Sequence, residues 1–296
     1  MKADFQKASI VIATINHAEV LKRVLEAMLR LDYPNDYEII VADDGSTDST
    51  KEMLQSNFRN NKKIKLIFLR HGGVCKARNA GIRAARFPIV INMDHDCIPS
   101  KGWLRDMVKG FNSEKVGIVS AYDYYGGTST AFRKNLLDKV GGYDEDYVYY
   151  REDTDLSFKI MDLGYEFRLV KANYVHEHKL AKPSGFVEFA KHAVQRLKYH
   201  QNDVLLYKKH PTEVCKKFLN IKFGFLVSAL SDFKAATGLW EKGVGFSISS
   251  PRGIVFLENK SPLHALAIIL AGIAYVIAVK ISRLIGSIKF GKLLIP

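Results

Sequence analysis

Cysteine is scarce in this chain of 296 residues. Only Cys75, Cys97 and Cys215 are present, an odd number with no C-x-x-C pair among them. This pattern argues against a zinc ribbon or a disulfide framework and favours a reducing compartment. The N-terminal segment MKADFQKASI also lacks the apolar stretch of a secretory signal. Together with the basic and apolar C-terminal region described below, these features lead us to expect a peripheral or single-span protein on the cytoplasmic face of a membrane.

Two nucleotide-binding motifs are missing as well. No G-x-G-x-x-G opens the first predicted helix, and no G-x-x-x-x-G-K-[ST] occurs anywhere. Their absence argues against a dinucleotide-dependent dehydrogenase and against a P-loop nucleotidase.

Acidic residues become rare toward the C-terminus. Up to His176 there are 26 Lys and Arg against 24 Asp and Glu, whereas from Glu177 onward there are 18 against 7. Nearly all of the net charge of +13 therefore lies in the last 120 residues. A nucleic-acid-binding protein with basic residues throughout would not show this division, so we expect no nucleic-acid partner. The division predicts a near-neutral first domain and a basic region that meets an anionic surface.

Short apolar runs alternate with helical patterns over the first 120 residues. Strands are predicted at Ser9–Ala13, Glu38–Ala42, Ile64–Leu69 and Ile89–Met93, and helices at His17–Leu31 and Val74–Arg86. This order predicts an α/β fold with a doubly wound, mostly parallel sheet flanked by helices.

The rest of the chain is predicted to form a basic helical region and an apolar C-terminal extension. Phe186–Tyr207 reads as one basic amphipathic helix, and Leu263–Val279 contains no formally charged residue. The apolar run fits a transmembrane helix, an in-plane or re-entrant membrane helix, or a buried helix of a soluble protein. We expect domains at 1–180, 181–260 and 261–296.

Acidic side chains follow two predicted parallel strands. Asp43 and Asp44 follow one strand, and Asp94 and Asp96 follow another. Ligands of open parallel sheets bind at the carboxyl ends of the strands, so these residues are expected to gather at one edge. Carboxylates on one rim repel each other unless a cation or a donor lies among them. The pattern predicts a Mg²⁺ or Mn²⁺ site that also receives substrate phosphates.

Two further clusters have both a functional and a purely structural interpretation. Lys76 and Arg78 open a helix where they would neutralise a pyrophosphate, or they lie on a solvated helix face. Glu152 and Asp153 open another helix, where acidic residues also serve as partners of the helix dipole.

Glycine pairs lie near these acids. They are Gly126–Gly127 and Gly141–Gly142. Because glycine permits close approach to the backbone, we expect Gly126 and Gly127 to contact an acceptor substrate.

Six segments, in this order along the chain, resemble those of the family 2 inverting glycosyltransferases with a GT-A fold. They are SIVIATINH, EIIVADDGSTDST, GVCKARNAGI, VINMDHD, GGTSTAFRKNLLDKVGGYDED and REDTDLSFKIMDLGY. The resemblance covers about residues 8–180. It implies a nucleotide-diphosphate sugar as donor and a divalent metal, Mg²⁺ or Mn²⁺.

The resemblance also implies roles for individual residues. The nucleotide is expected to contact residues of the strand ends and of the A-R-N-x-G stretch, namely Thr14, Asn16, Asp43 or Asp44, Lys76, Arg78 and Asp94. The metal is expected at Asp96, with Asp94 close to the ribose and His176 as a further ligand. Asp153 is expected to act as the general base, with Glu152 beside it.

The resemblance is incomplete at three places. Ile15 stands where the family often has an aromatic residue, and His71 replaces a frequent asparagine. QRLKY at 195–199 deviates from the Q-x-x-R-W acceptor motif of processive synthases. We therefore expect transfer of one sugar to a hydroxyl of a membrane-bound, lipid-linked or glycan acceptor. The alternatives are transfer to a polyprenyl phosphate, transfer to a soluble or protein acceptor, and a non-catalytic protein that binds sugar nucleotides.

Overall fold

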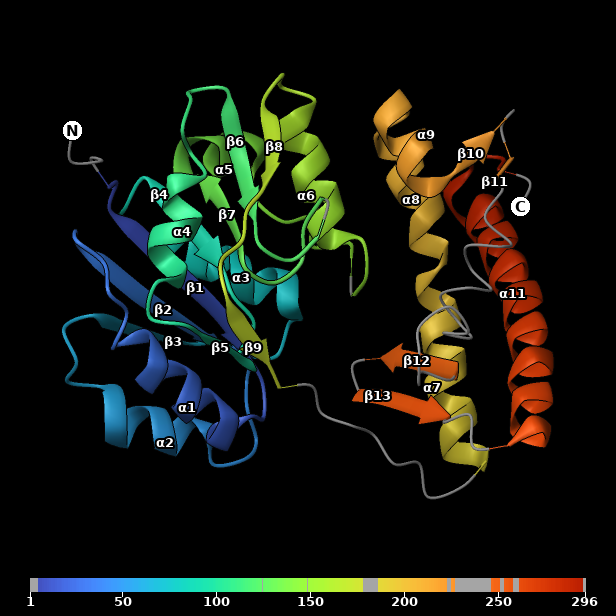
Figure 1. Ribbon diagram of the computed structural model, residues 1–296, viewed down its shortest axis with the longest axis horizontal. Helices are drawn as coiled ribbons and strands as arrows, with labels where there is room; N and C mark the ends of the chain where they lie inside the picture. Colours follow the sequence, from blue (N-terminus) through green and yellow to red (C-terminus); the bar gives the residue numbers. More distant parts are fainter. Residues whose placement is uncertain are drawn as a thin grey trace. The chain divides into compact units, whose positions relative to one another are not determined.

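The computed structural model describes residues 5–123, 125–147, 149–177, 186–222, 225–226, 246–250, 253–257 and 261–294 (Figure 1). The chain forms two compact units. The first unit comprises Met1–Val148 and Glu152–Glu177, and the second comprises Tyr149–Arg151 and His178–Pro296. The chain therefore joins the second unit for three residues before it returns to the first unit at Glu152.

A seven-stranded sheet forms the centre of the first unit. Its strands are β1 (Ala8–Thr14), β2 (Tyr37–Asp43), β3 (Ile64–Phe68), β4 (Ile89–Asn92), β6 (Val116–Ser120), β7 (Thr130–Arg133) and β8 (Glu166–Leu169). They lie in the order β3-β2-β1-β4-β7-β6-β8. β7 runs antiparallel to β4 and β6, and the other neighbouring pairs are parallel. The predicted α/β fold with a mostly parallel sheet is confirmed.

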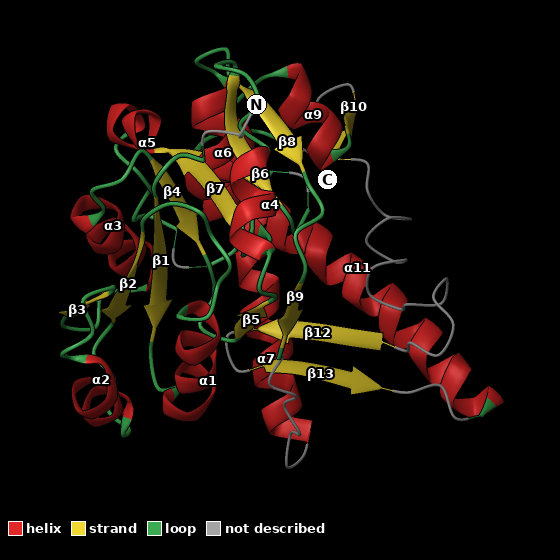
Figure 2. Cartoon of the chain, turned by 60° about the vertical axis from the view of Figure 1, so that its left-hand side comes forward, coloured by secondary structure: helices red, strands yellow, loops and turns green. Residues whose placement is uncertain are grey.

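Helices cover both faces of this sheet (Figure 2). They are α1 (Ala18–Met28), α2 (Thr50–Phe58), α3 (Val74–Ala84), α4 (Trp103–Lys109), α5 (Lys134–Val140) and α6 (Glu152–Met161). Alternate side chains of a strand point to opposite faces, so Ile10 and Ile12 join the core cluster that contains Leu21 of α1. Val11 points the other way, toward α3, and a Cβ on Gly81 would lie only 2.4 Å from its Cγ1. The glycine of the A-R-N-x-G stretch thus allows α3 to lie close to β1.

Strand register brings the expected site residues to one edge. Thr14 at the end of β1 pairs with Asp43 at the end of β2. Beyond β4, the short strand β5 (Cys97–Pro99) pairs antiparallel with β9 (Tyr174–His176), which places His176 opposite Cys97. This pairing carries a residue from the end of the first unit to the segment that contains Asp94 and Asp96.

The second unit combines helices with short hairpins. Its elements are α7 (Phe186–Tyr199), α8 (Gln201–Lys209), α9 (Glu213–Leu219), β10 (Ile221–Lys222), β11 (Phe225–Leu226), β12 (Phe246–Ser250), β13 (Gly253–Leu257) and α11 (Pro262–Phe290). β10 pairs with β11 and β12 with β13, both antiparallel.

The prediction of one continuous helix over Phe186–Tyr207 is wrong. The helix ends at Tyr199 and a second begins at Gln201, with the His200 amide bonded to the Leu197 carbonyl. Residues next to this turn contact segments that are distant in sequence, which apolar periodicity does not reveal. The Asn202 side chain donates to the carbonyls of Tyr149 and Tyr150, and a Cβ on Gly286 of α11 would lie 3.0 Å from the Gln201 Cα.

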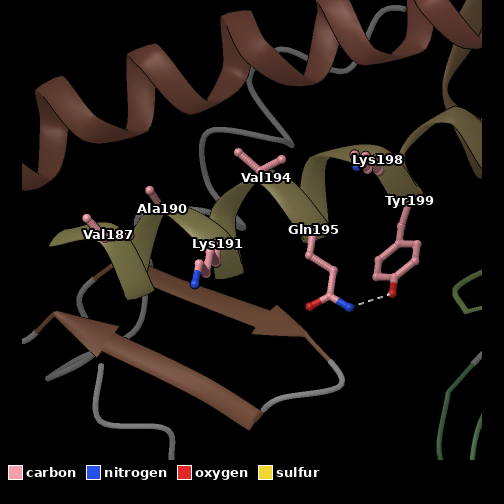
Figure 3. A pocket seen from close by; sticks show the side chains of 7 residues that line it. All are labelled: Val187, Ala190, Lys191, Val194, Gln195, Lys198 and Tyr199. Atoms are coloured by element: carbon pink, nitrogen blue, oxygen red, sulfur yellow. Dashed lines mark hydrogen bonds between the residues drawn. The ribbon is translucent and has the colours of Figure 1, made fainter. Parts of the chain in front are cut away.

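A groove of about 650 Å³ runs along α7 (Figure 3). Its lining residues are Val187, Ala190, Lys191, Val194, Gln195, Lys198 and Tyr199. The Gln195 Nε2 donates to the Tyr199 hydroxyl at 3.1 Å. The QRLKY segment thus lies in the second unit.

The apolar C-terminal run is part of a longer helix. α11 begins after Ser261, whose Oγ accepts the His264 amide, and ends at Gly291 in the left-handed conformation. Its 29 residues correspond to about 43 Å at about 1.5 Å per residue. Within the described part of the chain, α11 is the one helix long and apolar enough to cross a membrane.

Candidate active site

The loops after β1 and β2 are bonded to each other. The Asn16 side-chain oxygen accepts from the backbone amides of Thr47 and Asp48, and the Asn16 amide donates to the Ser46 hydroxyl. Asp43 in turn accepts from the Ser46 amide at 3.2 Å. These bonds fix the D-D-G-S turn beside the end of β1.

Asp44 holds the loop that precedes α3. Its carboxylate accepts from the Gly72 and Gly73 amides at 2.8 and 2.9 Å, and its Oδ2 lies 2.8 Å from the His71 Nδ1. Thr14 is also buried here, and its hydroxyl makes no hydrogen bond with the protein atoms described. The expected nucleotide-binding residues Thr14, Asn16, Asp43 and Asp44 therefore lie together at the ends of β1 and β2.

Arg78 is the centre of the second part of the site. This buried guanidinium lies 3.1 Å from the Asp94 Oδ1, 3.1 Å from the Asp153 Oδ1 and 3.4 Å from the Glu152 Oε1. One cation from α3 thus joins the D-x-D segment after β4 to the first turn of α6. Lys76 is exposed on α3, because residues two positions apart on a helix do not share a face.

Burial and neighbouring charges shift the pKa values of the groups around Arg78. Burial and the neighbouring Asp153 raise the pKa of Glu152 to about 7. Burial also raises the pKa of Asp153, against the opposing effect of Arg78. Burial lowers the pKa of Arg78, but its carboxylate neighbours outweigh this and raise it well above the ordinary value. A pair of carboxyl groups with raised pKa values is typical of acid–base sites.

Tyr143 holds Asp153 from the other side. Its hydroxyl donates to the Asp153 Oδ1 at 2.9 Å and accepts from the Asn92 side chain at 2.9 Å. Tyr143 is itself fixed by Asn79, which bonds to both its amide and its carbonyl. No sequence pattern singles out Tyr143, although it stands in the segment GGYDED.

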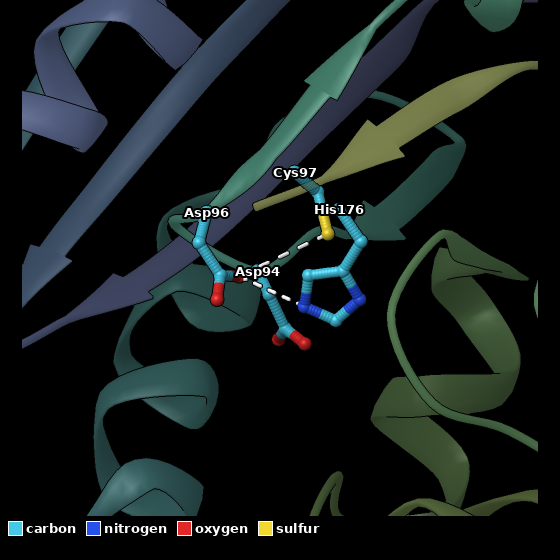
Figure 4. Close-up of side chains that lie close together, drawn as sticks. All are labelled: Asp94, Asp96, Cys97 and His176. Carbon is cyan, nitrogen blue, oxygen red and sulfur yellow. Dashed lines mark hydrogen bonds and ion pairs between the residues drawn. The ribbon is translucent and has the colours of Figure 1, made fainter. Parts of the chain in front are cut away.

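A second cluster lies beside the first. Asp94, Asp96, Cys97 and His176 each direct one ligand atom to the same place, and all four atoms lie within 4.8 Å of one another (Figure 4). The His176 Nε2 lies 3.2 Å from the Asp96 Oδ1. Burial opposes ionisation of Asp96, but His176 lowers its pKa, and Asp96 in turn raises the pKa of His176 against burial.

The donor atoms of this cluster fit a divalent cation. Two carboxylates and an imidazole are ligands that Mn²⁺ accepts, and carboxylates also suit Mg²⁺. Burial raises the pKa of the Cys97 thiol, and a protonated thiol is not a metal ligand. The Thr128 hydroxyl accepts the Asp94 amide at 2.9 Å and thereby orients this segment, a role that sequence patterns did not indicate.

The glycine turn at Gly126–Gly127 lies against the acids. A Cβ on Gly126 would lie 2.8 Å from the Asp153 Cβ, and one on Gly127 would lie 2.4 Å from the Tyr122 ring. Both glycines have φ near +120°, which residues with a side chain rarely adopt. Gly142 approaches Asn79 in a similar way.

The family model described as glycosyl transferase family 2 matches residues 9–178, more than half of the chain. This chain belongs to glycosyl transferase family 2. The matched region contains every residue of the two clusters described above.

Individual relatives agree with this family assignment. The chain is 25% identical over 218 residues to the probable glycosyltransferase YdaM of Bacillus subtilis, with 60% of this chain and 51% of that protein covered. It thus spans about half the length of this relative.

Two solved structures show the same fold. The mannosyltransferase PcManGT from Pyrobaculum calidifontis, in complex with GDP-Man and Mn²⁺, has a TM-score of 0.60 and 19% identity, covering 95% of this chain and 88% of its own. TarS 1–349 of S. aureus, in complex with UDP-GlcNAc, has a TM-score of 0.60 and 18% identity, covering 97% of this chain and 92% of its own. The GT-A-like fold expected from the resemblance is confirmed.

The metal cluster generates the first prediction. We expect Asp96→Asn and His176→Ala to weaken Mn²⁺ binding at least about tenfold, since even indirect partners of ligands are worth about 10–100-fold. Electron paramagnetic resonance of free Mn²⁺ measures this affinity without substrate. Cys97→Ser is the matched control and should bind Mn²⁺ like the wild type. Equal binding by all four proteins would show that the ion is held elsewhere.

Proposed function

We propose that this chain transfers one sugar from a nucleoside-diphosphate sugar to a hydroxyl group of a membrane-bound acceptor, with inversion at the anomeric carbon. The observation that carries the proposal is the shared position of Asp94 and Asp153 on one guanidinium, that of Arg78. In this proposal, the phosphate-binding edge and the base would share one site. Family membership supports the same reaction class.

The nucleotide is assigned to the edge formed by β1, β2 and the loop before α3. Thr14, Asn16, Asp43 and Asp44 would surround the base and ribose, and Asp94 would lie nearer the ribose. A divalent cation held by Asp94, Asp96 and His176 would stabilise negative charge on the departing diphosphate. Arg78 provides a fixed positive charge beside the same edge, and Lys76 provides an exposed one.

Asp153 is assigned as the general base. Tyr143 and Arg78 both bond to its Oδ1, so Oδ2 is the oxygen that we assign to the acceptor proton. Its raised pKa makes it a stronger base than an ordinary aspartate. As the hydroxyl loses its proton to Oδ2, its oxygen attacks the anomeric carbon opposite the leaving diphosphate, which inverts the configuration.

The acceptor is assigned to the Gly126–Gly127 turn. Gly126 lies against Asp153, and Gly127 lies against the ring of Tyr122, which is about half exposed. A hydroxyl bound at this turn would lie next to the proposed base. In this assignment the catalytic region is 1–180, and 181–260 and 261–296 serve the acceptor and the membrane.

Membrane contact is assigned to the exposed face of α11. Most of its large exposed apolar residues recur every three or four positions and form one stripe: Leu263, Leu266, Leu270, Ile273, Ile277, Ile281, Leu284 and Ile288. Ile285 is exposed beside Leu284 and widens the stripe there. The opposite face packs within the second unit, where the Ser282 hydroxyl donates to the Leu197 carbonyl and Lys208 donates to the Phe290 carbonyl. A helix packed along polar α8 favours an in-plane position over a membrane span. The basic second half would contact anionic lipids of the cytoplasmic leaflet.

The proposed base generates a mutational prediction. Asp153→Asn should lower kcat by about 10²–10⁴-fold, because a general base supplies about that factor. Binding of the donor, measured by calorimetry with UDP-GlcNAc or GDP-mannose and Mn²⁺, should stay within about twofold. Asp146→Asn, at an exposed acid of the same segment, is the control. Unchanged turnover in Asp153→Asn would instead favour a polyprenyl phosphate, an acceptor that is already ionised.

The coupled acids generate a pH prediction. Asp153 works as a base only when deprotonated, and it ionises together with the adjacent Glu152, whose pKa is raised to about 7. We therefore expect kcat/KM to rise with pH through the ionisation of this pair. In Glu152→Gln the ionisation of Glu152 is gone, and the remaining acid limb, due to Asp153, should lie at lower pH. Rate profiles at constant Mn²⁺ measure both curves. Superimposable profiles would contradict the assigned coupling.

The stripe on α11 generates a binding prediction. The wild type should float with phosphatidylcholine–phosphatidylglycerol vesicles in a density gradient, whereas Leu270→Glu/Ile277→Glu should stay at the bottom. Asn60→Glu, at an exposed position of the first unit, should float like the wild type. If the double variant floats with the vesicles, the stripe on α11 is not the membrane contact.

A further inference from the structure

The three residues Tyr149–Arg151 belong to the second unit, although the chain on either side belongs to the first. They directly precede Glu152 and Asp153, the acids assigned to proton transfer. Since Arg151 is joined directly to Glu152, the contacts that hold these three residues can affect the position of both acids.

A buried carboxylate holds Arg151. Asp203 of α8 is fully buried, and its Oδ1 lies 2.6 Å from the Arg151 Nε. Its Oδ2 lies 2.9 Å from both the Nε and an Nη of Arg283 on α11. Burial opposes ionisation of Asp203, but Arg151 and Arg283 lower its pKa well below the ordinary value. The two arginines thus share one charged partner.

Further contacts fix the backbone of the same segment. The Asn202 side chain donates to the carbonyls of Tyr149 and Tyr150, both at 3.0 Å. The Arg151 guanidinium lies 4.2 Å from the centre of the Tyr150 ring and 4.8 Å from that of Phe218. Side chains of α8 and α9 therefore hold the segment at both its backbone and its arginine.

The segment adopts a backbone conformation that it would not keep unaided. Tyr150 and Arg151 have φ of 71° and 78°, in the left-handed region that side chains with a Cβ disfavour. Two successive bulky residues in this region persist only where surrounding contacts impose it, and such strain clusters at functional sites. After this turn the chain enters α6 with Glu152 and Asp153 in contact with Arg78.

We propose that Arg151, held by Asp203, is a positioning residue that keeps Glu152 and Asp153 in place for proton transfer; this rests on the function proposed above. Arg283 pairs with the same carboxylate but lies on α11, far along the chain from the acids. Its contribution is to the stability of the second unit. The two arginines therefore provide matched variants that separate positioning from stability.

The test compares Arg151→Gln with Arg283→Gln in the full chain. Each variant removes one of the two arginines that pair with the buried Asp203, so both should lower the melting temperature. Only Arg151→Gln should lower kcat, by about tenfold or more, with the donor KM within about twofold. Arg151→Lys keeps the charge and should recover most of the lost kcat. The assay is Mn²⁺-dependent hydrolysis of UDP-GlcNAc and GDP-mannose.

Hydrogen exchange provides a readout that needs no substrate. Arg151→Gln should speed amide exchange over residues 149–156, whereas Arg283→Gln should speed it in α8 and α11 only. Should Arg151→Gln fail to fold, Asn202→Ala removes the bonds to Tyr149 and Tyr150 without changing charge, and the same acceleration and loss of kcat are expected.

The outcomes separate the two proposals. Equal loss of kcat and equal exchange in the Arg151→Gln and Arg283→Gln proteins would reduce the network to a structural role and overturn the inference. A wild type that hydrolyses no sugar nucleotide would overturn the proposed function, while the exchange pattern would still decide whether Arg151 positions the start of α6.

Discussion

The Arg78 guanidinium contacts Asp94, Glu152 and Asp153 in a buried setting, and the rest of the site depends on this one cation. Without it, three carboxylates would repel each other and take up protons. Loss of one member of a buried ion pair typically destabilises by about 3–5 kcal/mol. Gly81 allows α3 to pack close against Val11 of β1. This close packing determines where the Arg78 side chain, which α3 carries, lies in the site.

In the proposed function, Arg78 and a bound divalent cation would have separate roles. Arg78 is covalently fixed and stays with the proposed base, whereas Asp96 and His176 form the side of the D-x-D segment available to a metal. Asp94 belongs to both groups and links them. The pairing of β9 with β5 matters here, because it brings His176 from the end of the first unit to Asp96. The proposed base and the leaving group would then be stabilised by different groups.

Local sequence patterns predict the sheet and most acids of the site. They do not predict the contacts between segments that are distant in sequence. Asp94, Asp96, Glu152 and Asp153 stand at strand and helix ends, which apolar periodicity locates well. Tyr143 and Thr128 act through bonds to residues distant in sequence, so no local signal marks them. The short strands β5 and β9 have three residues each, too few for periodicity. The break at His200 depends on packing against α11 and on the 149–151 segment, and it was therefore missed.

In the proposed active site, the metal–diphosphate edge and the base lie in one site. Anomalous diffraction at the manganese edge, from crystals grown with Mn²⁺ and UDP or GDP, tests this arrangement most directly. The account predicts one strong peak within coordination distance of Asp96 and His176, with the diphosphate between it and Arg78. A peak remote from these residues, or a nucleotide bound away from the ends of β1 and β2, would contradict it.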